Sequence, residues 1–152
     1  MESKNFEKHI ANKLKDLKFK KKSFKFLDDF PLIIGKQALY VMDWQNSENV
    51  YQRGVKELLG YDHNEFQFDI VLNYFHADDL NIMRRIIKGS VEHCAQQNYK
   101  GKNEYLHIKH RVQKKDETYI LLLRQTQKFE STHNGRLKST LSLVNDISFV
   151  SD

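Results

Sequence analysis

The hydrophobic pattern of this chain changes near Glu104 from the period of helices to that of strands, and this change most constrains its fold. Beyond this point Leu106 and Ile108 alternate with polar residues, which is typical of a half-buried strand. The apolar run at 120–123 predicts a second strand with both faces covered. His133–Gly135 is a hairpin turn signal before a third apolar segment. The three expected strands cover residues 104–113, 119–126 and 137–147.

The first part of the chain predicts two further strands and a series of helices. The segments 38–43 and 50–53 are short and apolar, and the residues between them favour a turn. Two short helical regions are expected next, at 54–59, closed by a left-handed glycine at position 60, and at 64–72. The longest helix should begin at Asp78 or Asp79, where a carboxylate caps the free backbone N–H groups and His76 helps to cap them, and end near Gln97. Strands, then helices, then three strands define an α+β fold with an antiparallel sheet.

Composition and the single cysteine narrow the class of protein. A chain of 152 residues with 39% hydrophobic residues is long enough for one domain with its own core. Cys94 has no second cysteine to pair with, which suits a reducing compartment. No apolar run approaches the ~18 residues that a membrane span needs. We therefore expect a cytoplasmic protein that does not bind membranes.

The positive charge of the chain is concentrated at its N-terminus. Residues 1–27 hold nine lysines against three acidic residues, a net charge of +6, whereas residues 28–152 carry −1. A basic arm can attract nucleic acid through its long-range field, so a free-standing nucleic-acid-binding protein is an alternative interpretation. The arm contains no arginine, the residue that reads bases with two hydrogen bonds, and this favours a solvated, lysine-rich helix face instead.

The same N-terminal segment has the spacing of an amphipathic helix. Apolar residues recur along one stripe of residues 4–19, and lysines occupy the other faces. A helix this polar is marginal alone and needs a partner surface, so we expect it to drive formation of a homodimer. The dimerisation residues are expected to be Phe6, Ile10, Leu14 and Leu17. We predict a helical extension at 1–35, a globular domain at 36–148 and the start of a C-terminal connector at 149–152.

Five short motifs, in this order and at these spacings, resemble those of a PAS domain. The motifs are Tyr40-Val41-Met42-Asp43, Leu58-Leu59-Gly60-Tyr61, Phe75-His76-Ala77-Asp78-Asp79-Leu80, Arg111-Val112-Gln113-Lys114-Lys115-Asp116 and Asn145-Asp146-Ile147-Ser148. The resemblance covers residues 36–148. It implies a five-stranded antiparallel sheet covered by short helices on one face, in a module that senses a signal and regulates another domain. Glu117 stands where the family commonly has a turn glycine.

The residues give no sign of catalysis, and an enzyme is not expected. Flavin-binding relatives need a reactive cysteine just before the long helix, where this chain has Tyr74–His76. Haem-binding relatives use an axial histidine, but His93 beside an apolar stripe is better interpreted as structural or solvated. His107 and His110 lie three apart on a strand and face opposite sides, so they should not share a metal ion. We expect no flavin, haem or metal, and the identity of any other cofactor stays open.

The resemblance also implies a small apolar cavity between helices and sheet, with a fully packed core as the alternative. Its expected lining is Val41, Phe66, Ile70, Phe75, Met83, Ile87, Leu106, Ile108 and Leu122. Asp146 and Ile147 are expected to couple the domain to a C-terminal output domain. The function expected is a bacterial sensory module that binds a small ligand or mediates dimerisation, in a transcription regulator of the LuxR type. A sensor histidine kinase is the alternative. Any contact with DNA would be made through an output domain absent from this chain.

Overall fold

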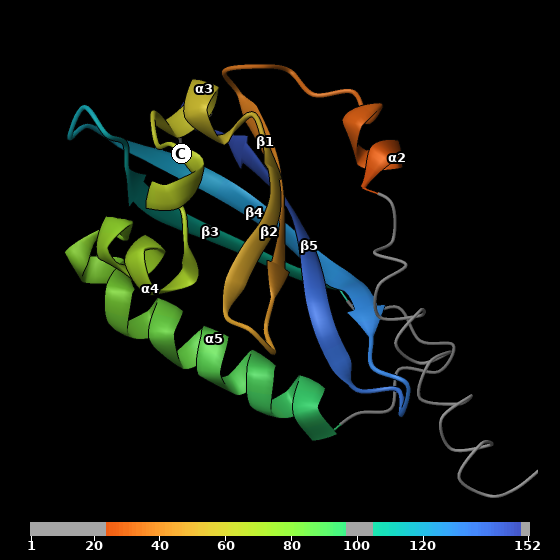
Figure 1. Cartoon of the computed structure of the whole chain (residues 1–152). Helices are drawn as coiled ribbons and strands as arrows, with labels where there is room; N and C mark the ends of the chain where they lie inside the picture. The colour runs from red at the N-terminus through yellow and green to blue at the C-terminus, as the bar shows by residue number, and fades with distance from the viewer. Residues whose placement is uncertain (1–23, 97–104, 150–152) are drawn as a thin grey trace, which may run out of the picture. The chain divides into compact units, whose positions relative to one another are not determined.

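Figure 1 shows the computed structural model of the chain, which describes residues 24–96 and 105–149. The chain divides into two compact units, Met1–Pro31 and Leu32–Asp152. The described part of the first unit contains one short helix, α2 (Lys25–Asp28). The residues predicted to drive dimerisation lie outside the described part of the chain: Phe6, Ile10, Leu14 and Leu17.

The second unit is built on one five-stranded antiparallel sheet with the strand order β2-β1-β5-β4-β3. The strands are β1 (Gln37–Asp43), β2 (Glu48–Arg53), β3 (Tyr105–Gln113), β4 (Tyr119–Ser131) and β5 (Leu137–Asp146). The last strand of the chain lies at the centre of the sheet, where it pairs with both β1 and β4. The α+β class and the antiparallel sheet predicted from the sequence are confirmed.

The helices between β2 and β3 lie on one face of this sheet (Figure 1). They are α3 (Val55–Leu59), the 3-10 turn η1 (His63–Glu65), α4 (Phe68–Val71), the 3-10 turn η2 (Leu72–Tyr74) and α5 (Ala77–Gln96). The predicted second helical region is therefore divided into three short pieces. The predicted end of β4 was also too early, because polar residues such as Lys128, which pairs with Thr140 of β5, still belong to the strand.

The core lies between these helices and the sheet, in two clusters of buried side chains. The first joins α3 to the sheet through Leu58 and Leu59, which pack with Tyr40, Leu122 and other residues of the sheet. The second lies under α5 and consists of Phe75, Met83 and Ile108. These two clusters hold the long helix against β3 and the short helices against β1.

The Leu58–Tyr61 motif docks α3 on the turn between β3 and β4. Gly60 has φ +89°, the left-handed conformation predicted for it, and ends the helix. A Cβ atom at Gly60 would lie 2.9 Å from the Cβ of Lys115, so only glycine allows this close approach. The Lys115 backbone N–H donates to Leu59 O at 2.9 Å, and its Nζ lies 2.8 Å from a carboxylate oxygen of Glu65.

Candidate ligand-binding site

A cavity of about 470 Å³ lies between α5 and the sheet face that this helix covers. Strands β1, β3, β4 and β5 contribute one wall, and α5 contributes the other through residues between Arg85 and His93. Most of the wall is apolar or aromatic, including Tyr40, Met42, Phe66, Ile87 and Leu106. This volume and lining fall within the range of pockets that bind small organic molecules.

Most hydroxyl groups on the sheet side of the cavity already have hydrogen-bond partners. Thr126 of β4 and Ser142 of β5 are linked through their hydroxyl oxygens at 2.7 Å. The indole Nε1 of Trp44 donates to the hydroxyl of Thr140 at 2.9 Å. These bonds fix the strands and the Trp44 side chain, and they leave the cavity with few polar groups that need a ligand.

Arg124 is a polar residue of this wall with a buried donor that has no partner among the described residues. It lies on β4, paired with Ile108 on one side and Val144 on the other. Its Nε atom is buried and has no hydrogen-bond partner among the described residues. A buried N–H group without an acceptor costs free energy, so Arg124 is the group of this cavity that a ligand could satisfy.

Three of the predicted lining residues do line the cavity, namely Phe66, Ile87 and Leu106. The other six are placed elsewhere. Phe75, Met83 and Ile108 fill the cluster beneath α5, Leu122 belongs to the larger cluster, Ile70 is half-buried in α4, and Val41 is fully buried in β1.

Val41 is absent from the cavity wall because of the pleat of the strand. Successive side chains of a strand point to opposite faces, and its neighbours Tyr40 and Met42 both line the cavity. Val41 therefore points to the other face of the sheet. Tyr40, Met42 and Arg124 were missed by sequence reasoning. The sequence feature that could have indicated Arg124 is its charge within the otherwise apolar start of β4. For Tyr40 and Met42 it is the alternation of side chains along β1, which places both on the same face.

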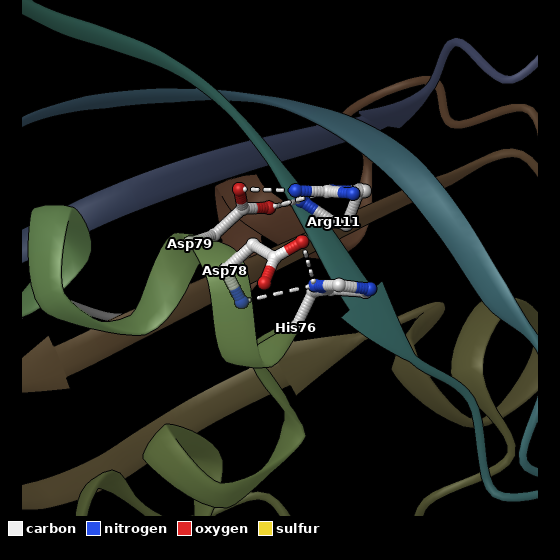
Figure 2. Close-up of polar contacts among 4 residues, drawn as sticks. All are labelled: His76, Asp78, Asp79 and Arg111. Carbon is white, nitrogen blue, oxygen red and sulfur yellow. Dashed lines mark hydrogen bonds and ion pairs between the residues drawn. The ribbon is translucent and has the colours of Figure 1, made fainter.

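The first turn of α5 is joined to β3 by a fork of hydrogen bonds, shown in Figure 2. The Nη2 and Nε atoms of Arg111 donate to the two carboxylate oxygens of Asp79 at 2.8 and 3.0 Å. The Arg111 backbone N–H donates to the same carboxylate at 2.9 Å. These bonds to Arg111 hold the pKa of Asp79 down at about 2, so the carboxylate stays ionised at neutral pH.

The helix cap agrees with the prediction for His76 and differs from it for the two acidic residues, because α5 begins at Ala77 and neither Asp78 nor Asp79 is its N-cap residue. His76 takes this place. Its Nδ1 accepts the Asp78 backbone N–H at 3.1 Å (Figure 2). Its carbonyl oxygen accepts the Asp79 N–H at 2.9 Å. Asp78 points into solvent, with 77% of its side chain exposed. The two acidic residues thus have different roles, and the second one joins the helix to the sheet.

His110 is a buried titratable group close to this junction. It is 5% exposed, its ring meets that of Phe75 edge to face at 4.9 Å, and neither ring nitrogen has a hydrogen-bond partner among the described residues. Burial, together with the positive charge of Arg124, lowers the pKa of His110 to about 4. His110 is therefore neutral at physiological pH.

The residues predicted to couple the domain to an output lie at the end of β5. Asp146 makes no ion pair within the described residues, and its carboxylate instead accepts the Ser148 backbone N–H at 2.9 Å. Ile147 N–H donates to Leu121 O, and the Ser148 hydroxyl accepts the Leu121 N–H, both at 2.9 Å. The chain that leaves β5 is thereby held against the beginning of β4.

The profile of the PAS fold matches residues 49–144, which is well over half of the chain. The chain belongs to the PAS family. This agrees with the sheet order, with the helices on one face and with the places taken by the five motifs. A comparison with curated proteins found no match.

Solved PAS domains share this fold at low sequence identity. A PAS domain from Colwellia psychrerythraea is 18% identical, with a TM-score of 0.58, and the match covers 88% of this chain and 98% of that one. The N-terminal domain of a diguanylate cyclase with a PAS/PAC sensor from Marinobacter aquaeolei is 16% identical, with a TM-score of 0.59 over 75% of this chain and 97% of that one. A sensory box histidine kinase/response regulator from Burkholderia thailandensis is 15% identical, with a TM-score of 0.55 over 74% and 78%.

Among residues 24–96 and 105–149, no three histidine, cysteine or acidic side chains gather closely enough to hold a metal ion. No helix within those same residues is long and apolar enough to cross a membrane.

Proposed function

We propose that this PAS domain is the sensory module of a bacterial signalling protein, and that it responds to a small molecule bound in the cavity under α5. The cavity itself carries this proposal. Most of its wall is divided between the sheet and α5, and Phe66 and Val71 complete it. A molecule that enters or leaves this space changes the contacts of α5 and of the strands that line it.

The proposed route to the output begins at the end of β5. Ile147 and Ser148 are hydrogen-bonded to Leu121, so the chain that follows them starts from a fixed place at β4. A change in the sheet near Leu121 would thereby reach a connector and a C-terminal output domain. The output proposed is transcription regulation through a DNA-binding domain of the LuxR type. A histidine kinase output is the second candidate, because a sensory box histidine kinase/response regulator contains a domain of the same fold.

Ligand binding is tested with a neutral apolar probe such as indole, which reports on the cavity without regard to charge. Ser90 is a half-buried residue of α5 that lines the cavity, and Ser90→Phe should fill part of the space. Asn81→Phe is the matched control, since Asn81 is exposed on the same helix and does not line the cavity. In ligand-observed NMR, indole should bind the wild type and the control and lose its binding to Ser90→Phe. Equal binding to all three proteins, or no binding to any, would contradict the proposal.

The two outputs are distinguished on the product of the whole gene. If that protein binds promoter DNA and does not phosphorylate itself with ATP, it is a transcription regulator. If it phosphorylates itself, it is a kinase.

A further inference from the structure

Arg124 and Arg111 differ in the groups that surround their guanidinium groups. Arg111 is fully engaged by the carboxylate of Asp79. Arg124 makes no ion pair with a described residue, its Nε is buried without an acceptor, and the residues beside it in the sheet are Ile108 and Val144. Arg124 as a whole is half-buried, and its Nε–H lacks the bond that normally compensates for the burial of an N–H group. Because its guanidinium makes no hydrogen bond with a described residue, it is available to a group that the chain itself does not supply.

The charges around the cavity indicate what that group is. The described residues that line it include Arg85 and Lys128 beside Arg124, and they include no aspartate or glutamate. A cationic ligand would meet only like charges there, and a neutral apolar one would leave the Arg124 N–H unsatisfied. A planar carboxylate matches the guanidinium fork with two parallel hydrogen bonds and balances its charge.

The apolar residues of the wall indicate the chemistry of the part of the ligand that lies away from Arg124. Beyond Arg124 the cavity is bordered by Met42, Phe66, Ile87 and Leu106, which offer apolar surface and no strong hydrogen-bonding group. Burial of a hydrocarbon chain against these residues is favourable in proportion to the area removed from water. A ligand that satisfies the whole cavity has an anionic head and an apolar tail.

We propose that the cavity binds an amphipathic monocarboxylic acid, with its carboxylate on the guanidinium of Arg124 and its tail between α5 and the sheet. This inference rests on the proposed ligand-sensing function and specifies the chemical class of the ligand. Arg124 is then the residue that distinguishes acids from neutral molecules of the same shape.

The test compares three probes with one tail and different heads: octanoate, octan-1-ol and octylamine. Binding to the full chain is measured by isothermal titration calorimetry at pH 7.5. Octanoate should bind the wild type most tightly, octan-1-ol more weakly and octylamine weakest. Arg124→Met removes the charge and keeps an unbranched apolar side chain, and should weaken octanoate by about tenfold or more while octan-1-ol changes little.

Two further variants separate this role from a general effect. Arg85 also lines the cavity but is exposed, so Arg85→Met should weaken octanoate by only about twofold, as expected of a screened charge. Arg124→Lys keeps the charge without the fork and should fall between wild type and Arg124→Met. A thermal melt of ligand-free Arg124→Met should show a midpoint equal to or above that of wild type, because an unsatisfied buried donor has been removed.

The outcomes separate this inference from the function on which it rests. If octan-1-ol binds as tightly as octanoate, or if Arg124→Met binds octanoate normally, the inference is wrong while ligand binding in the cavity stands. If none of the three probes binds the wild type and indole does not bind either, both the inference and the proposed function are overturned.

Discussion

Asp79 should contribute far more to stability than Asp78, although the two are neighbours in the first turn of α5. The perturbation is Asp79→Asn, which keeps the shape of the side chain, removes its charge and replaces one acceptor oxygen by an NH₂ donor. The matched control is Asp78→Asn, because both carboxylates face the positive end of the same helix dipole.

The difference in magnitude follows from their partners. Asp79 accepts three hydrogen bonds from Arg111, two of them from the guanidinium. Within the described part of the chain the carboxylate of Asp78 pairs only with His76, at 3.8 Å. Bonds to charged groups are worth about 1.5–3 kcal/mol, and partial exposure screens this fork, so Asp79→Asn should cost about 2 kcal/mol. Asp78→Asn loses only its interaction with the dipole, about 0.5 kcal/mol.

The assay is a pair of thermal melts and urea titrations at pH 7. For a chain of this length Asp79→Asn should lower the melting midpoint by about 6 °C, and Asp78→Asn by about 1–2 °C. Because the folded-state pKa of Asp79 is about 2 and lies below its ordinary value of 3.8, the contribution of the pair is complete above that ordinary value. It is lost as the pH falls toward 2, so the difference between wild type and Asp79→Asn should shrink between pH 5 and pH 2.

Equal midpoints for the two variants at pH 7 would refute the reasoning, since they would reduce Asp79 to a second dipole charge. A difference that stays constant down to pH 2 would show that the charge of Asp79 is not what stabilises the junction of α5 and β3.

Three further predictions rest on other parts of the chain. The pKa of His110 is lowered from 6.5 to about 4 in the folded chain. As the pH falls, His110 therefore takes up a proton in the unfolded chain before it does so in the folded chain, and the free energy of unfolding should fall by about 2 kcal/mol between pH 7 and pH 5. Urea titrations of His110→Phe should show a smaller loss over this range, and an unchanged loss would contradict the assignment. Glu117 has φ +73°, so Glu117→Gly should raise stability by about 0.5 kcal/mol in thermal melts. Asp116→Gly, the control in the same turn, should lower stability because the Asp116 carboxylate accepts two hydrogen bonds from Thr118. If the N-terminal stripe makes a homodimer, Ile10→Asp or Leu14→Asp should turn a dimer into a monomer in sedimentation experiments on the full chain, and a wild type that is already monomeric would contradict this.

The order and type of the longer elements could be predicted from the sequence because each has a strong period. Alternation after Glu104 located β3, and the helical spacing of Met83 and Ile87 located α5 to within a turn. The ends were harder to predict. α5 begins earlier than expected because His76, which was expected only to help a carboxylate, supplies the cap itself. The sequence cannot show that Asp79 has Arg111 as a partner, because the two residues are distant in the chain and meet only once the sheet forms.

The lining of the cavity was predicted less well than the fold, partly because side chains alternate between the two faces of a strand. The sequence predicts Val41 in the lining, whereas the cavity is lined by the residues on either side of it. Phe75 and Met83 are also predicted in the lining, yet they pack closely in a core cluster and leave no space there. The polar group of interest, Arg124, stood in the sequence as an interruption of an apolar strand and was not considered as a ligand contact.

The fork between Asp79 and Arg111 also determines how α5 can move. The described polar contacts between this helix and the sheet are gathered at its first turn, whereas the residues that line the cavity begin at Arg85, two turns further along. A helix of 20 residues is ~30 Å long. The fork holds the first turn of α5, and the buried Met83 holds its second turn against Ile108 of β3, so the rest of the helix can tilt about this end. A small tilt about Asp79 changes the width of the cavity at its far side by several times the displacement near the pivot. We therefore expect ligands of different length to be accommodated by the angle of α5, with the angle itself as the quantity that reports which ligand is bound.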